Sequence, residues 1–105
     1  MDVTTAFERR SEVQFLDVRE DEEWVAGRIE GALHVPVMQL PQRMGEIDRA
    51  RPVVAVCRMG SRSDYAAGWL SDRGYDAHNL DGGMEAWDAA GLPFSTPDGG
   101  RGVVA

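Results

Sequence analysis

The stretch that decides the fold is "PVVAVCRMGSRSDYAAGWL", residues 52–70. Its first five residues, 52–56, form an unbroken apolar run, which is typical of a central parallel strand covered on both faces. Helical spacing follows over residues 61–74, and Ser61 and Asp64 stand at the spacing of a capping box at its start. The sequence therefore predicts a buried strand that leads through a short polar loop into a helix.

Elements of these two kinds alternate along the rest of the chain. The apolar and turn patterns predict further strands at residues 13–18, 32–36 and 76–80, and further helices at residues 20–27, 38–47 and 83–91. This alternation indicates the α/β class, with a mainly parallel central sheet of about five strands flanked by helices on both faces. We expect a single domain over residues 1–105, whose last residues, roughly 96–105, form a flexible tail.

Composition excludes several classes of function. The net charge is −7 at pH 7, which argues against nucleic acid as a partner. No apolar run approaches the length of a membrane span, so we expect no membrane partner. The single cysteine and the absence of a recognisable secretory signal predict a cytoplasmic protein. Nothing in the sequence indicates a cofactor, and no histidine pair has metal-ligand spacing, so we expect neither a cofactor nor a metal.

The single cysteine, Cys57, lies between the predicted strand and the predicted helix, with Arg58 and Arg62 close behind it. The N–H groups at a helix start favour an anion, and arginines add positive charge, so this setting lowers the pKa of a thiol. Gly60 lets the loop curl so that successive N–H groups point inward. The plainer alternative is an inert cysteine at a strand end. Two arginines within six residues favour a reactive thiolate.

The length of the loop separates two chemistries. Cys57 and Arg62 are spaced as C-x4-R, whereas cysteine phosphatases use C-x5-R to surround a tetrahedral phosphate. A tighter ring suits a smaller group, the outer sulfur of a cysteine persulfide. A phosphatase or arsenate reductase of related fold is therefore the less favoured enzyme, and a binding module without catalysis is a further alternative.

Three motifs in order resemble those of the rhodanese family, in its single-domain sulfurtransferase form. These are "FLDVREDEEWVAGRIEGALHVP" (15–36), "VVAVCRMGSRS" (53–63) and "GYDAHNLDGGMEAWDAAGLP" (74–93), and the resemblance extends over nearly the whole chain. Where the family often has Gly-His-Ile, this chain has Gly27-Arg28-Ile29, a position usually counted as structural.

The resemblance implies a thiosulfate sulfurtransferase. Cys57 would take a sulfane sulfur from a small anionic donor such as thiosulfate and pass it to cyanide or a thiol, including one on a partner protein that receives relayed sulfur. It also implies the roles of the loop residues. Arg58, Met59, Gly60 and Ser61 would supply an amide cup, with the Arg58 side chain at the mouth, and Arg62 would close the loop and face the anion.

Asp17 and Arg19 follow the first strand, at the same predicted edge of the sheet as Cys57. They are candidates for supporting residues that orient the loop by hydrogen bonds. The alternative, which we favour, is a structural ion pair with Glu20 or Glu23 that holds the end of the strand. The acidic run at residues 20–23 is expected to be a solvated helix start that complements the helix dipole.

Overall fold

The computed structural model describes the whole chain, residues 1–105. Its sheet has four parallel strands in the order β2-β1-β3-β4. They are β1 (Gln14–Asp17), β2 (Leu33–His34), β3 (Val53–Val56) and β4 (Ala77–Asn79). The prediction of a parallel sheet is confirmed. The expected count of about five strands is wrong by one. Outside these four strands the chain forms only isolated antiparallel bridges, at Arg28, Ser95 and Arg101.

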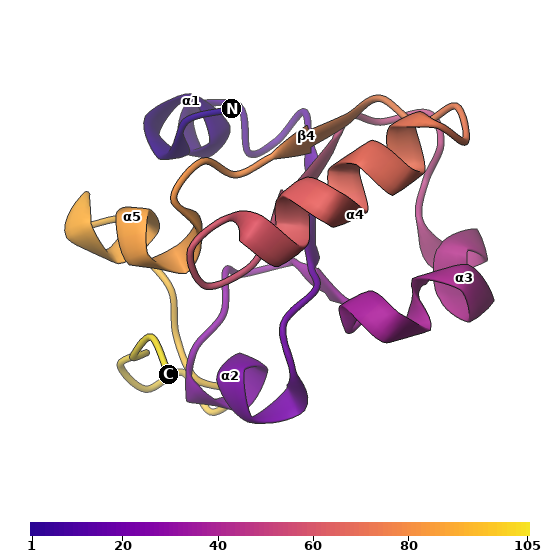
Figure 1. Cartoon of the computed structure of the whole chain (residues 1–105). Helices are drawn as coiled ribbons and strands as arrows, with labels where there is room; N and C mark the ends of the chain where they lie inside the picture. The colour runs from indigo at the N-terminus through magenta and orange to yellow at the C-terminus, as the bar shows by residue number, and fades with distance from the viewer.

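Helices cover both faces of the sheet, as expected (Figure 1). In chain order they are α1 (Val3–Glu8), α2 (Asp21–Ala26), α3 (Leu40–Arg43), α4 (Ser61–Ser71) and α5 (Gly83–Ala89), with short 3-10 turns η1 (Val37–Gln39) and η2 (Met44–Glu46). The expected helix over residues 38–47 is thus three short pieces, because Pro41 and Gly45 disfavour one continuous helix. None of the helices is long and apolar enough to cross a membrane.

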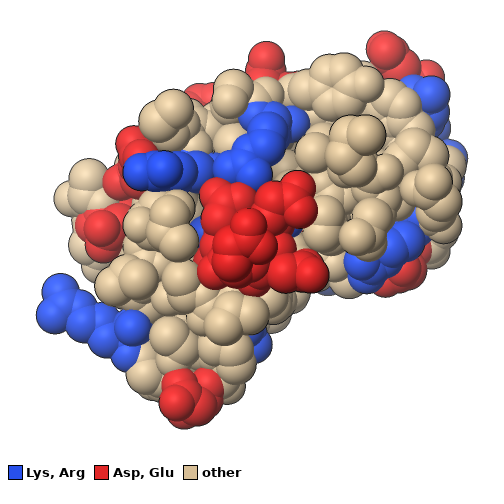
Figure 2. Space-filling view, turned by 60° about the horizontal axis from the view of Figure 1, so that its bottom comes forward, with Lys and Arg blue, Asp and Glu red and all other residues tan.

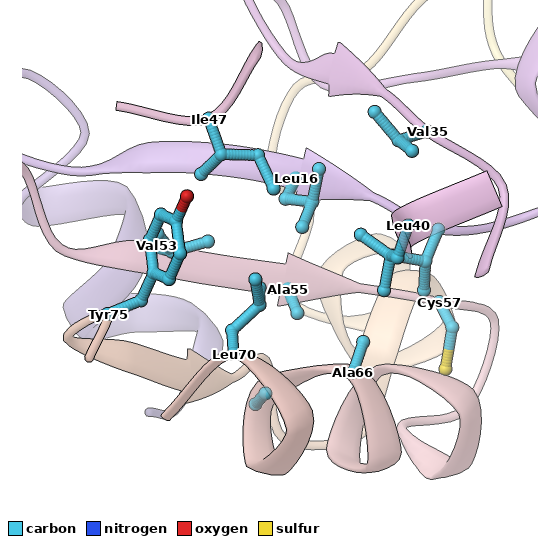
Figure 3. Close-up of a cluster of buried hydrophobic side chains, with 12 residues drawn as sticks. Leu16, Val35, Leu40, Ile47, Val53, Ala55, Cys57, Ala66, Leu70 and Tyr75 are labelled. Carbon is cyan, nitrogen blue, oxygen red and sulfur yellow. The ribbon is translucent and has the colours of Figure 1, made fainter. Parts of the chain in front are cut away.

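The two-residue period of the strands divides the core into two clusters. In β1, Leu16 faces α3 and α4 while Phe15 faces α1 and α5; Ala55 and Val54 in β3 divide in the same way. All four residues of β3 are fully buried, as the apolar run predicts for a central strand. Figure 3 shows the first cluster, with Cys57 at its end beside the first turns of α4.

Strand register places the candidate residues at one edge of the sheet. Asp17 pairs with Val56 in β3, and Ala55 pairs with Asn79 in β4. The carboxyl ends of β1, β3 and β4 therefore lie side by side. The loop that begins at Cys57 follows the middle strand of these three, β3, and so lies between the ends of β1 and β4. This edge is where an open parallel sheet forms its sites.

The C-terminal residues fold back over the end of α2. The Val103 N–H donates to Ala26 O, and Gly27 and Gly102 both lie against the ring of Phe94. The Arg28 and Ser95 backbones exchange two hydrogen bonds. Flexibility of residues 96–105 concerns motion and stays a prediction.

Candidate active site

Cys57 lies at the carboxyl end of β3 and is almost completely buried, with 1% of its surface exposed. Its sulfur accepts a hydrogen bond from the Gly60 N–H at 2.9 Å and lies 3.1 Å from the Ser63 hydroxyl oxygen. Both partners belong to the turn that joins the loop to α4. Two hydrogen-bond donors therefore lie against the thiol, and one of them, the Gly60 N–H, belongs to the loop residues expected to form an amide cup.

Gly60 is the residue that turns the chain into α4, with φ of +109°. This left-handed conformation brings its N–H back toward the Cys57 sulfur, and glycine adopts it without the steric cost of a Cβ. The expectation of a Ser61–Asp64 capping box is wrong, because Gly60 occupies the N-cap and makes no side-chain cap bond. An N-cap without a side chain leaves the N–H groups of this turn free to face the sulfur.

Hydrogen bonds make Cys57 more acidic than an ordinary thiol. Burial by itself raises the pKa of Cys57, since a buried thiolate loses hydration. The Ser63 hydroxyl and the backbone N–H groups of Ser63, Gly60 and Met59 act in the opposite direction and outweigh burial, so the net shift of the pKa is downward. The thiolate, which is the nucleophilic form, is thereby favoured.

Ser63 and Asn79 are site residues that the sequence analysis did not single out. Ser63 lies in the first turn of α4 and is fully buried, and its hydroxyl contacts both the Cys57 sulfur and Oδ1 of Asn79, the last residue of β4. Ser63 could have been found from the sequence, because it places a hydroxyl directly after Arg62 in the motif. The signal for Asn79 was only its place at a strand end, because the contact depends on the pairing of β3 with β4.

The first turn of α5 holds the loop from the other side. The Met84 N–H donates to Cys57 O at 2.8 Å, and the Glu85 N–H donates to Arg58 O at 3.0 Å. This approach depends on Gly83, whose φ is +60° and where a Cβ would meet the carbonyl oxygens of both Cys57 and Arg58. Gly83, the second glycine of "DGG" at 81–83, therefore has a direct part in shaping the loop.

Arg62 reaches a carboxylate on α2. Its Nη1 and Nη2 donate to Oε1 and Oε2 of Glu23 at 2.8 and 2.9 Å, and the Glu23 side chain is only 13% exposed. These hydrogen bonds raise the pKa of Arg62 and lower that of Glu23. The expectation that the acidic run is simply solvated is therefore wrong for Glu23. Arg62 still lies close enough to Cys57 for the thiolate to add to the rise in its pKa.

The remaining loop residues are exposed to solvent. Arg58 is exposed and its Nε donates to Oε2 of Glu85 on α5 at 3.0 Å. Met59 is 61% exposed, and Ser61 is exposed at the start of α4. In Figure 2 the face that carries α2 is turned toward the reader, and acidic side chains gather there directly beside basic ones. The surface around the loop and α2 therefore carries both charges side by side.

Asp17 and Arg19 bind each other. Nε and Nη2 of Arg19 donate to the Asp17 carboxylate at 2.9 and 2.8 Å, and Nη2 also donates to Gly27 O. Both side chains are buried, with exposures of 1% and 0%. The expected ion pair with Glu20 or Glu23 is wrong. The observed pair ties the end of β1 to the end of α2, the helix that carries Glu23.

Comparison with known proteins gives a consistent result. Residues 3–90 match the family model described as the rhodanese-like domain. A sulfurtransferase of Allochromatium vinosum is 42% identical over 89 residues, which are 84% of this chain and 83% of that protein. A thiosulfate sulfurtransferase of Shewanella oneidensis is 38% identical over 79 residues, 74% of this chain and 78% of that protein. The crystal structure of a rhodanese-related protein from Thermoplasma volcanium matches with a TM-score of 0.87 at 26% identity, covering 90% of this chain and 94% of that one.

Proposed function

The chain belongs to the rhodanese-like domain family, and from this premise we propose that it is a sulfurtransferase that works through a persulfide on Cys57. The proposed donor is thiosulfate or a similar small anion, and the proposed acceptor is cyanide or a thiol. The observation that carries the proposal is the hydrogen-bonded sulfur of Cys57, which accepts from Gly60 and lies against Ser63. Sulfurtransferases among the relatives support the same reaction class.

The reaction has two balanced steps. In the first, the Cys57 thiolate attacks the outer sulfur of thiosulfate, a new S–S bond forms, the S–S bond of thiosulfate breaks, and sulfite leaves as a dianion. In the second, a cyanide or thiolate acceptor attacks the outer sulfur of the persulfide. Thiocyanate or a new persulfide leaves, and the Cys57 thiolate is restored. The sulfur is transferred as a neutral atom, so neither an oxidant nor a reductant is consumed.

The loop residues have proposed parts in these steps. The backbone N–H groups of Met59, Gly60 and Ser61 stabilise negative charge on the outer sulfur, and the Arg58 backbone completes the cup. The Arg62 guanidinium faces the anion while Glu23 holds it in place. The Arg58 side chain binds the donor at the mouth. Asp17 and Arg19 support the site by fixing the ends of β1 and α2.

A thiol-bearing protein is a second proposed acceptor. Met59, two residues beyond Cys57, exposes 61% of its surface and offers an apolar contact at the mouth. A partner that presents its thiol there would receive the outer sulfur by the same second step. This relay shares the persulfide with the first proposal and differs only in the acceptor.

Intact mass spectrometry under non-reducing conditions tests the persulfide. The protein is incubated with thiosulfate beside a Cys57→Ser variant, and we expect a gain of one sulfur atom that appears only with Cys57 and is lost on adding cyanide. If no sulfur is gained while Cys57 alkylates readily at neutral pH, the proposed donor is wrong. Phosphate and arsenate compounds would then be tested as substrates. A Cys57 that neither gains sulfur nor alkylates would favour a binding module.

A further inference from the structure

Three side chains from three elements form one line that ends at the nucleophile. Asn79 at the end of β4 contacts Ser63 in the first turn of α4, and Ser63 contacts the sulfur of Cys57 after β3. Cys57 and Ser63 are buried, whereas Asn79 is half-buried. Bulk water therefore cannot readily take over the role of the middle hydroxyl.

The Ser63 hydroxyl has one hydrogen and two neighbours that can accept it. Its oxygen lies 3.1 Å from the Cys57 sulfur and also within hydrogen-bond distance of Asn79 Oδ1. When Cys57 is a thiol, both contacts can be satisfied: the thiol donates to Ser63 and the hydroxyl donates to Asn79 Oδ1. When Cys57 is a thiolate, it has no hydrogen, and the one hydroxyl hydrogen cannot serve both the sulfur and Oδ1.

Rotation of the Asn79 amide removes this conflict. If the amide turns over, Nδ2 faces Ser63 and donates to its oxygen, and the hydroxyl hydrogen is released toward the Cys57 sulfur. Nδ2 donates to no protein group in the structure. It lies beside Gly60, and a Cβ placed on that glycine would be 3.4 Å from Nδ2. The turn therefore breaks no other hydrogen bond of the amide within the protein.

We propose that Asn79 is a positioning residue that reverses the direction of the Ser63 hydroxyl when Cys57 changes from thiol to thiolate. The proposal rests on the reactive Cys57 of the proposed function. In the thiol state the order of donation is Cys57 to Ser63 to Asn79. In the thiolate state it runs from Asn79 to Ser63 to Cys57, and the thiol proton has passed to solvent or a base in solution. An amide serves both states because it carries an acceptor and a donor, whereas a carboxylate only accepts.

The charged groups around Cys57 come from five places and are paired. Arg62 on α4 is bound to Glu23 on α2, and Arg58 in the loop is bound to Glu85 on α5. Beyond the end of β1, Asp17 and Arg19 bind each other. Asn79 is neutral and contacts Cys57 only through Ser63, so its replacement leaves these ion pairs in place.

The test measures the rate at which iodoacetamide alkylates Cys57 as a function of pH, because the midpoint of this profile reports the thiolate. We expect Asn79→Asp to move the midpoint to higher pH and to slow alkylation at neutral pH roughly tenfold, the effect of losing one hydrogen bond to a charged group. Asn79→Leu, a neutral side chain of similar size that accepts no hydrogen bond, leaves the hydroxyl hydrogen free to donate to the sulfur and should move the midpoint much less. His78→Asn, one residue away on β4, should keep the wild-type profile.

A double-mutant cycle separates the relay from a plain effect of charge. If Asn79 acts through Ser63, Asn79→Asp should add little to the shift already caused by Ser63→Ala. An equal shift in both backgrounds, an unchanged midpoint in a folded Asn79→Asp protein, or a shift as large in Asn79→Leu as in Asn79→Asp overturns the proposal. The readout needs no sulfur donor. A relay found without persulfide formation would therefore count against the proposed function alone, and a persulfide formed without a relay would count against Asn79 alone.

Discussion

Glu23 and Arg62 are 39 residues apart in sequence and form a bidentate ion pair between α2 and α4, with both N–O distances below 3.0 Å. The Glu23 carboxylate also accepts from the Glu20 N–H at the start of α2. One carboxylate therefore fixes the arginine of the loop to a neighbouring helix. It also compensates part of the positive charge that an anionic donor would meet.

Replacement of Arg62 by alanine should reduce thiosulfate turnover steeply, by roughly a hundredfold, because the anion loses its fixed positive charge. The measurement is kcat/KM with thiosulfate and cyanide. Arg9→Ala, which removes an exposed arginine paired with Glu12, is the matched control and should behave as wild type. Near-normal kinetics in the Arg62 variant would contradict its assigned role.

Replacement of Glu23 by glutamine should lower the KM for thiosulfate about two- to fivefold, since Arg62 keeps its place but loses a compensating charge. The matched control is Glu46→Gln, because Glu46 in η2 forms a similar two-contact pair with Arg43 at the end of α3. Steady-state kinetics at low ionic strength measure the effect. A higher KM in the Glu23 variant would mean that the carboxylate serves mainly to position Arg62.

The lowered pKa of Cys57 predicts a pH dependence of stability. The folded thiol ionises at lower pH than the unfolded one, whose pKa is about 8.5. Between these two values the unfolded chain binds more protons, so the free energy of unfolding rises with pH. The contribution is fully present above the unfolded pKa and is lost as pH falls through the folded pKa. Urea unfolding of the wild type and of Cys57→Ser, compared across this range, measures it; parallel profiles would contradict the lowered pKa.

Gly83→Ala should destabilise the protein and abolish persulfide formation. A Cβ there meets the carbonyl oxygens of Cys57 and Arg58, and the clash and the positive φ together cost about 2–4 kcal/mol. Gly91 has a similar φ of +72° but open space around it, so Gly91→Ala isolates the conformational cost of about 1–2 kcal/mol. Chemical denaturation measures both variants. Equal losses of stability would show that the contact with the loop carries no cost of its own.

Gly68→Ala should stabilise the protein by about 0.5–1 kcal/mol, the difference in helix propensity between the two residues. Gly68 lies on the exposed side of α4, and a Cβ there meets nothing within 4 Å. Thermal unfolding measures the gain, with turnover as the control for an intact site. A loss of stability would reveal a packing role that the open space around Gly68 does not suggest.

Much of the fold was predictable because each element carries its own local pattern. The apolar run at 52–56 became the fully buried β3, and the other three strand predictions match observed strands within two residues at each end. The prediction of which residue would cap a helix was wrong, because neighbouring residues of one turn compete for the N-cap position. Ser61 lost the N-cap to Gly60, whose left-handed backbone aims its N–H at the Cys57 sulfur. The spacing of Ser61 and Asp64 could not reveal this, because the N-cap is set by the backbone conformation of Gly60.

The sequence by itself determined the alternation of strands and helices, the position of Cys57 at a strand end and the short loop that follows it. Period and turn chemistry are local, so the order of residues is enough to reveal them. Only the tertiary structure decided the partners: Glu23 for Arg62, Asn79 for Ser63, and Asp17 for Arg19. The first two pairs join residues 39 and 16 positions apart, and helix packing and strand register bring them together. Asp17 and Arg19 are neighbours, but burial selected this pairing over the nearby glutamates.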